Sequence, residues 1–138
     1  MRTIEEILRS SRVIAVVGLS DRPERPSYGV AAYLQSRGYR IIPVNPRLFG
    51  PVLNEQPYPD LESVSEKVDL VDIFRRSNEV LPVVESSISI GAPAVWLQLG
   101  VVNELAAAAA RDAGLDVIMD RCIAIEHRVL VAAGVFPR

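Results

Sequence analysis

Short, nearly continuous apolar runs recur along the chain and alternate with longer stretches in which apolar residues return every three or four positions. The first pattern predicts parallel strands that are covered on both faces, and the second predicts amphipathic helices. The expected strands lie at residues 12–18, 39–44, 68–74, 94–99 and 115–119. The expected helices lie at residues 3–9, 27–37, 78–90 and 102–114, with a short helix near residues 61–65.

Polar residues and glycines mark where these helices start and stop. Thr3 is followed three residues later by Glu6, the spacing of a capping box. Ser27 is the expected N-cap of the next helix, and Gly38 is its expected C-terminal stop. Gly114 ends the alanine-rich helix in the same way.

The strict alternation of strands and helices predicts the fold class. It indicates an α/β protein with a single doubly wound parallel sheet of about five strands, right-handed crossovers and helices on both faces. No linker separates two halves of the sequence, so residues 1–138 are expected to form one domain. In this architecture a ligand binds beyond the carboxyl ends of the strands, near the switch in strand order.

Composition and charge narrow the function. The chain has 138 residues, 49% of them hydrophobic, and a net charge of -2, which gives no general attraction for a nucleic acid backbone. Cys122 is the one cysteine, so neither an internal disulfide nor a C-x-x-C zinc site is expected. Residues 1–12 carry several charges and resemble neither a signal peptide nor a membrane span, so a cytoplasmic location is expected.

The loop after the first strand resembles a dinucleotide loop with two glycines missing. Gly18 ends the strand, but Ser20 stands where the G-x-G-x-x-G pattern needs its second glycine. The Ser20 hydroxyl can bind a phosphate, and Arg22 and the helix start at Ser27 add positive charge and free N–H groups. The alternative is a solvated loop that its prolines stiffen.

The turn after the second strand lacks the acid that an NAD site uses. Asn45 and Pro46 occupy the place where an Asp or Glu would bind the ribose hydroxyls, which argues against NAD. Asn45 can bind a phosphate or ribose, and Arg47 can pair with a phosphate. The alternative is that Asn45 and Pro46 only form a turn.

The third and fourth strands end in further candidates. Phe74 either lies against an adenine or a pantetheine chain or belongs to the core, and Arg75 and Arg76 follow at the mouth of the expected site. Gln98 either binds a ligand or bonds a neighbouring loop, whereas Trp96 is expected in the core. Arginines after three strand ends converge on one edge of the sheet, and this convergence favours binding of an anion more than any single residue does.

Candidates for catalysis are few. Cys122, at the end of the fifth strand, is either a nucleophile at the same edge of the sheet or a small buried side chain. Glu126 and His127 are adjacent, but without a second histidine or a compact acidic cluster no metal site is expected. His127 is expected to be a surface or structurally bonded side chain. No convincing catalytic constellation emerges, and an enzyme is not expected.

Five motifs in register, "VVGLS", "GYRIIPVNP", "VDLVDIF", "VWLQLG" and "MDRCIAIEH", resemble those of the small stand-alone CoA-binding proteins. The resemblance covers roughly residues 5–130 and extends to the CoA-binding Rossmann domain of the succinyl-CoA synthetase α subunit and of acyl-CoA synthetases. It implies that coenzyme A binds at the carboxyl edge of the sheet. The positions that it implicates are Gly18, Ser20, Asn45, Pro46, Phe74, Arg75 and Gln98.

The resemblance implies non-catalytic binding of coenzyme A or an acyl-CoA. Two alternatives stay open: a subunit of an acyl-CoA ligase that acts with a separate partner chain, and an NAD(P)-sensing module. The larger relatives use a phosphorylated histidine in an additional domain, and His127 lies outside any such domain, so the catalytic role is not transferred to it. Together with the residues above, Arg22, Ser27, Arg47 and Cys122 complete the expected binding set.

Overall fold

A five-stranded parallel sheet forms the centre of the protein in the computed structural model, which describes residues 1–136. All neighbouring strands pair in parallel, and their order is β2-β1-β3-β4-β5. The chain therefore forms β2 on one side of β1, and then crosses back to form β3, β4 and β5 on the other side. The strands are β1 (Val13–Val17), β2 (Arg40–Val44), β3 (Leu70–Ile73), β4 (Ala94–Leu97) and β5 (Asp116–Met119).

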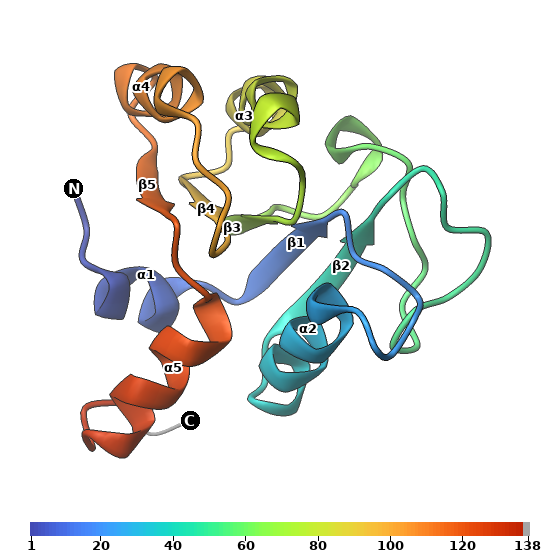
Figure 1. Cartoon of the computed structure of the whole chain (residues 1–138), viewed down its shortest axis with the longest axis horizontal. Coiled ribbons are helices and arrows are strands. Elements are labelled where there is room, and N and C mark those ends of the chain that lie inside the picture. Colours follow the sequence, from blue (N-terminus) through green and yellow to red (C-terminus); the bar gives the residue numbers. More distant parts are fainter. Residues whose placement is uncertain (137–138) are drawn as a thin grey trace.

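Helices cover both faces of this sheet, as Figure 1 shows. On one face α3 packs against α4, and on the other α5 contacts both α1 and α2. The doubly wound α/β fold expected from the sequence is thus confirmed. The helices are α1 (Ile4–Ser10), α2 (Pro26–Ser36), α3 (Val80–Ser89), α4 (Glu104–Asp112) and α5 (Ile123–Ala132), with short 3-10 helices at Leu61–Ser63 and Ser77–Glu79.

Alternate residues of each strand feed two separate cores. In β1, Ala15 and Val17 belong to the cluster beneath α3 and α4, whereas Ile14 and Val16 belong to the cluster beneath α1, α2 and α5. Because successive strand side chains point to opposite faces, a strand buried on both sides reads as a continuous apolar run. Within residues 1–136 no helix is long and apolar enough to cross a membrane.

Some of the expected boundaries are confirmed and others are wrong. Thr3 and Glu6 form the capping box of α1, and the positive φ angles of Gly38 and Gly114 follow α2 and α4. Ser27 is not an N-cap: α2 begins at Pro26 with Arg25 as its cap residue, because proline suits the first helical position. Helix α5 was not expected from the sequence, because its apolar run "IAI" masks its helical period.

Asp72 is the one carboxyl group in the centre of the sheet. It lies in β3 beside Val16 of β1 and Trp96 of β4, and its side chain is 0% exposed. Neither carboxyl oxygen has a hydrogen-bond partner among residues 1–136. Burial without compensation raises the pKa of Asp72 well above its ordinary value of 3.8, since removal from water disfavours the charged form.

This burial makes the stability of the protein depend on pH. Above pH 3.8 the unfolded chain releases the Asp72 proton while the folded chain keeps it, so stability falls as pH rises toward the raised pKa. Asp72→Asn cannot ionise and escapes this loss. In urea titrations from pH 5 to pH 8, the unfolding free energy of Asp72→Asn should rise relative to that of the original chain. The expected increase is up to about 1.4 kcal/mol per pH unit. A constant difference across that range would contradict a protonated Asp72.

Candidate ligand-binding site

A cavity of about 1080 Å³ opens at the carboxyl edge of the sheet. It lies where the neighbouring strands β1 and β3 end and the strand order reverses. Its volume lies just above the range for small-molecule sites, about 300–1,000 Å³. The lining comes from the loops that follow all five strands and from the adjoining helix starts. The lining residues are Gly18, Ser20, Asp21, Arg22, Arg25, Pro26, Ser27, Val30, Asn45, Arg47, Leu48, Phe74, Arg75, Arg76, Glu79, Gln98, Leu99, Val101, Cys122 and Ile125.

The floor of the cavity is formed where two backbone segments meet. Gly18 has a φ of +88°, and a Cβ at this position would lie 2.0 Å from the carbonyl oxygen of Phe74. The Phe74 N–H donates to the Val17 carbonyl at 2.8 Å, which holds the two strand ends together. Only glycine fits this approach, because the conformation disfavours L side chains and the contact leaves no room for a Cβ.

The loop after β1 is fixed by its own serines. Ser27, buried in the first turn of α2, accepts a hydrogen bond from the Ser20 N–H through Oγ at 3.0 Å. The Ser20 Oγ in turn accepts from the Arg22 N–H at 3.1 Å. The two hydroxyl groups therefore shape the loop, which reaches toward the cavity in a defined conformation.

Asn45 fixes the loop after β2 in a similar way. Its Nδ2 donates to the Leu19 carbonyl at 3.1 Å, and its Oδ1 accepts from the Arg47 N–H at 3.1 Å. The amide thus ties the loops after β1 and β2 together beside the cavity. Pro46 is exposed and does not line the cavity, although its neighbours Asn45 and Arg47 do.

Five arginines give the cavity a surplus of positive charge. Arg22 and Arg25 follow β1, Arg47 follows β2, and Arg75 and Arg76 follow β3. No ion pair involves any of the five within the part of the chain that the structure describes. Asp21 and Glu79 are the two acids in the lining, so five positive and two negative charges leave a surplus of three. Unpaired arginines around an open cavity suit a ligand with several anionic groups.

Part of the cavity lining is uncharged. The residues that line it from the loops after β4 and β5 and from the start of α5 are Gln98, Leu99, Val101, Cys122 and Ile125. Gln98 is 4% exposed, and its Oε1 accepts a hydrogen bond from the Ile123 N–H at 3.0 Å. The arginine-bearing loop after β3 adjoins this uncharged lining, because the Ser77 Oγ accepts a hydrogen bond from the Val102 N–H at 3.0 Å.

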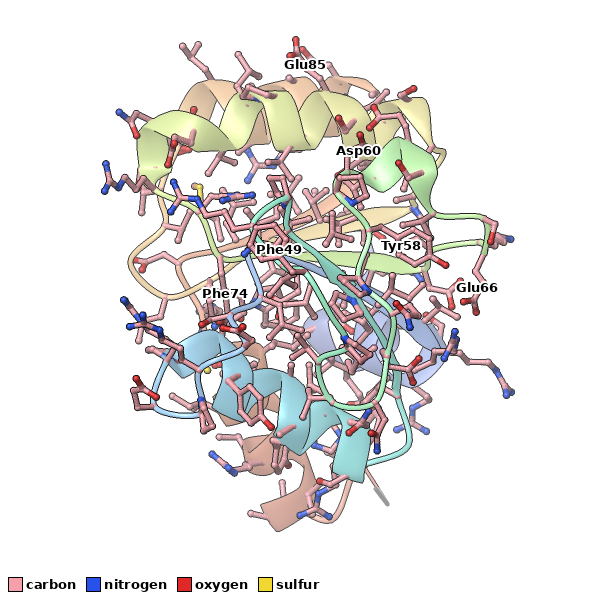
Figure 2. The ribbon with its side chains drawn as sticks, turned by 90° about the vertical axis from the view of Figure 1, so that its right-hand side faces the viewer. Phe49, Tyr58, Asp60, Glu66, Phe74 and Glu85 are labelled. Atoms are coloured by element: carbon pink, nitrogen blue, oxygen red, sulfur yellow. The ribbon has the colours of Figure 1, made fainter. Side chains whose placement is uncertain are left out.

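An aromatic side chain links the cavity to the core. Phe74 is half-buried: it packs against the core beneath α2 and α5 and also lines the cavity. In Figure 2 it is labelled between the layer of α3 above and α2 below. Phe49, on the loop after β2 that faces the viewer there, is 100% exposed and lies outside the lining. The two alternatives for Phe74 are therefore compatible, since one face of the ring can be in the core while another meets a ligand.

The structure brings almost all of the expected binding residues together. Ten of the eleven line this one cavity, with Pro46 as the exception. Five aliphatic side chains in the lining were not expected from the sequence: Val30, Leu48, Leu99, Val101 and Ile125. The sequence does not identify them as lining residues, because an apolar residue near a helix start or loop end gives the same pattern whether it faces a core or a ligand.

His127 and Trp96 lie apart from the cavity. His127 is 0% exposed, its Nδ1 is hydrogen bonded to the Tyr33 hydroxyl at 2.8 Å, and its ring packs edge-on against Phe136. Trp96 is fully buried and donates from Nε1 to the Arg121 carbonyl at 2.8 Å. Both side chains thus have the structural roles expected for them. No group of three or more potential metal ligands occurs among residues 1–136.

A family model, a curated relative and a solved structure each match most of the chain. Residues 12–128 match the family described as CoA binding domain. The uncharacterized protein YneT of Bacillus subtilis (strain 168) is 44% identical over 126 residues, which cover 91% of this chain and 93% of YneT. The solved structure of a hypothetical protein from Pyrococcus horikoshii OT3 is 38% identical, with a TM-score of 0.89 over 93% of this chain and 89% of that one.

A longer protein contains a similar unit. The apo structure of the dinucleotide forming acetyl-coenzyme A synthetase 1 of Ca. Korarchaeum cryptofilum is 26% identical, with a TM-score of 0.73. The similarity covers 86% of this chain but 28% of the synthetase chain. The same fold therefore occurs as one part of a larger protein.

The contact between Gly18 and Phe74 predicts a sharp effect of one added methyl group. Gly18→Ala places a Cβ against the Phe74 carbonyl in a strained conformation, so the backbone must shift. We expect urea denaturation to show a loss of about 3 kcal/mol or more of unfolding free energy. Gly29→Ala in α2, where no atom lies within 4 Å of the added carbon, is the control and should be neutral or stabilising by up to about 1 kcal/mol. Equal stability of the two variants would contradict the close approach.

Proposed function

Because the chain belongs to the family of CoA binding domains, we propose that it binds coenzyme A or an acyl-CoA in this cavity and carries out no reaction on it. The observation that carries the proposal is the ring of five unpaired arginines at the switch in strand order. Residues 1–138 would act as one binding domain, and the cytoplasmic location stays a prediction.

The charge of coenzyme A suits the arginine-bearing part of the cavity. The molecule carries a pyrophosphate and a 3′-phosphate on its adenosine end, so it offers more anionic groups than NAD. Arg22, Arg47 and Arg75 approach that part from three different loops. A guanidinium group can give a phosphate two parallel hydrogen bonds, so several arginines can share these anions.

The start of α2 adds to this binding of anions. Arg25 caps the helix without a side-chain hydrogen bond, and Pro26 and Ser27 in the first turn line the cavity. The N-terminus of a helix carries partial positive charge and N–H groups without intrahelical partners. A phosphate in this part of the cavity would gain from both.

The remaining lining suits the neutral parts of the same ligand. Val30, Leu48 and Phe74 offer apolar surface for an adenine ring or a pantetheine chain. Burial of such groups against apolar and aromatic side chains is the usual source of affinity in a small-molecule site. An NAD(P)-sensing role is less favoured, because Asn45 stands in place of the ribose-binding acid. Its side-chain amide is also hydrogen bonded to backbone groups of the neighbouring loops.

A second candidate is a subunit of an acyl-CoA ligase that works with a separate partner chain. The similarity to 28% of an acetyl-coenzyme A synthetase chain is the observation in its favour, because there the fold is one part of a longer enzyme. Co-purification of an ATP-binding partner, followed by ligase activity of the reconstituted pair, would support it. Absence of activity from that pair would contradict the ligase role, and only the binding role would remain.

Calorimetry tests the binding directly. We expect coenzyme A to bind more tightly than NAD, and dephospho-CoA to bind more weakly than coenzyme A because it lacks the 3′-phosphate. Arg75→Ala should weaken binding of coenzyme A about tenfold or more, since a hydrogen bond to a charged group contributes about 1.5–3 kcal/mol. Its matched control is Arg111→Ala in the last turn of α4, outside the cavity, which should bind as the original chain does.

Two results would contradict the proposal. One is the absence of heat with coenzyme A at near-millimolar concentration while NAD binds. The other is equal weakening by Arg75→Ala and Arg111→Ala, which would place the ligand outside this cavity.

A further inference from the structure

A second, smaller cavity lies on the face of the sheet that α3 covers. Its volume is about 140 Å³. A cavity of about 150 Å³ holds one benzene ring, so this one has room for a short branched aliphatic group. It is lined by the carboxyl ends of β1 and β2, by the chain around the start of the 3-10 helix Leu61–Ser63, by the loop after β3 and by one side of α3.

Most of the side chains around this small cavity are aliphatic. Val17, Val44 and Leu61 belong to the buried core beneath α3, where they are 2–4% exposed. Pro82 and Val83 of α3 extend the same apolar lining. The free energy gained by burial grows with the apolar area removed from water. A short aliphatic group would therefore be stabilised against this lining.

Two charged side chains of opposite sign also line the small cavity. Arg75, in the loop after β3, is half-buried, and Asp60, before the 3-10 helix, is exposed. Among residues 1–136 neither of them belongs to an ion pair, so they do not neutralise each other. In Figure 2 Asp60 is labelled close to α3 and away from Phe74. The cavity thus offers one cation and one anion beside its aliphatic lining.

Both charged groups keep capacity for a ligand. The Asp60 Oδ1 accepts hydrogen bonds from the Ser63 N–H, at 2.9 Å, and from the Ser63 hydroxyl, whereas Oδ2 accepts none from residues 1–136. Arg75 lines the larger cavity as well as the smaller one. A guanidinium group carries five N–H donors in a planar fork, so Arg75 can bind an anion in each cavity.

We propose that the small cavity binds an aliphatic α-amino acid of about the size of valine. Its carboxylate pairs with Arg75, its ammonium group donates to the Asp60 Oδ2, and its side chain packs against the aliphatic lining. A simple carboxylic acid or a simple amine would leave one of the two charged groups unpaired. The inference goes beyond the proposed function and does not depend on it, since Asp60 and Ser86, which line the small cavity, do not line the larger one.

An NMR titration of the folded protein with L-valine tests this inference. We expect saturable shifts of the backbone amide signals of residues 60–61 and 83–86, which adjoin the small cavity. Three further probes each lack one part of valine: 3-methylbutanoate lacks the ammonium group, isobutylamine lacks the carboxylate, and glycine lacks the aliphatic side chain. Each should bind at least about tenfold more weakly than valine, because each loses a charged hydrogen bond or buried apolar area. Equal binding of 3-methylbutanoate and valine, or no saturable shift with valine, would overturn the inference.

Two substitutions locate the ligand in this cavity. Asp60→Asn removes the charge but keeps a side-chain oxygen that can cap the 3-10 helix, and it should weaken valine binding at least about tenfold. Ser86→Phe fills the cavity from α3 and should abolish the saturable shifts. Its matched control is Ser89→Phe, at the exposed end of the same helix and outside both cavities, which should bind valine as the original chain does. Unchanged valine affinity in Asp60→Asn or in a folded Ser86→Phe would overturn the inference.

Calorimetry with coenzyme A on the same variants separates this inference from the proposed function. Asp60→Asn and Ser86→Phe should bind coenzyme A as the original chain does, whereas Arg75→Ala should weaken the binding of both ligands. Normal binding of coenzyme A without binding of valine would overturn the inference and leave the proposed function standing. Binding of valine without binding of coenzyme A would overturn the proposed function and support the small site.

Discussion

The contact between the Gly18 backbone and the Phe74 carbonyl is the constraint on which the site depends. It lets the carboxyl ends of β1 and β3 meet with no side chain between them. The order of strands reverses at this point, so the loops after β1 and β3 lead to helices on opposite faces of the sheet and leave a cavity between them. The absence of a Cβ at Gly18 thus allows the arginine-bearing loops after β1 and β3 to lie close together.

Much of the fold was predictable because it depends on local rules. Continuous apolar runs identified the strands, and Thr3 with Glu6 and the glycines after helices marked boundaries. Ser27 and α5 were misread for physical reasons. Proline at the first helical position outweighed serine as a cap, and an apolar first turn in α5 resembled the continuation of a strand. The burial of Asp72 could not be predicted from the sequence either, because a carboxyl group within an apolar strand is typical of an exposed position. Its burial becomes evident only once the neighbouring helices are in place.

The site was predictable as a set of residues but not as a set of roles. Residues after parallel strands must meet at one edge, so Gly18, Asn45, Arg75 and Gln98 could be grouped from the chain alone. Their hydrogen bonds depend on distances across loops that no local pattern encodes. Asn45 and Ser20 organise the backbone of their loops, and the Gln98 Oε1 accepts a hydrogen bond from the Ile123 N–H. The gathering of arginines from the loops after β1, β2 and β3 in one cavity follows from the strand order, which becomes visible only in the folded sheet.

The central claim is that a ligand with several phosphates binds in the cavity at this edge of the sheet, with its phosphates among the arginines. A crystal structure of the chain with coenzyme A bound tests that claim most directly. We expect the phosphate groups within hydrogen-bonding distance of the arginines that follow β1, β2 or β3. Coenzyme A bound outside the cavity, or inside it with its phosphates away from all five arginines, would contradict the account.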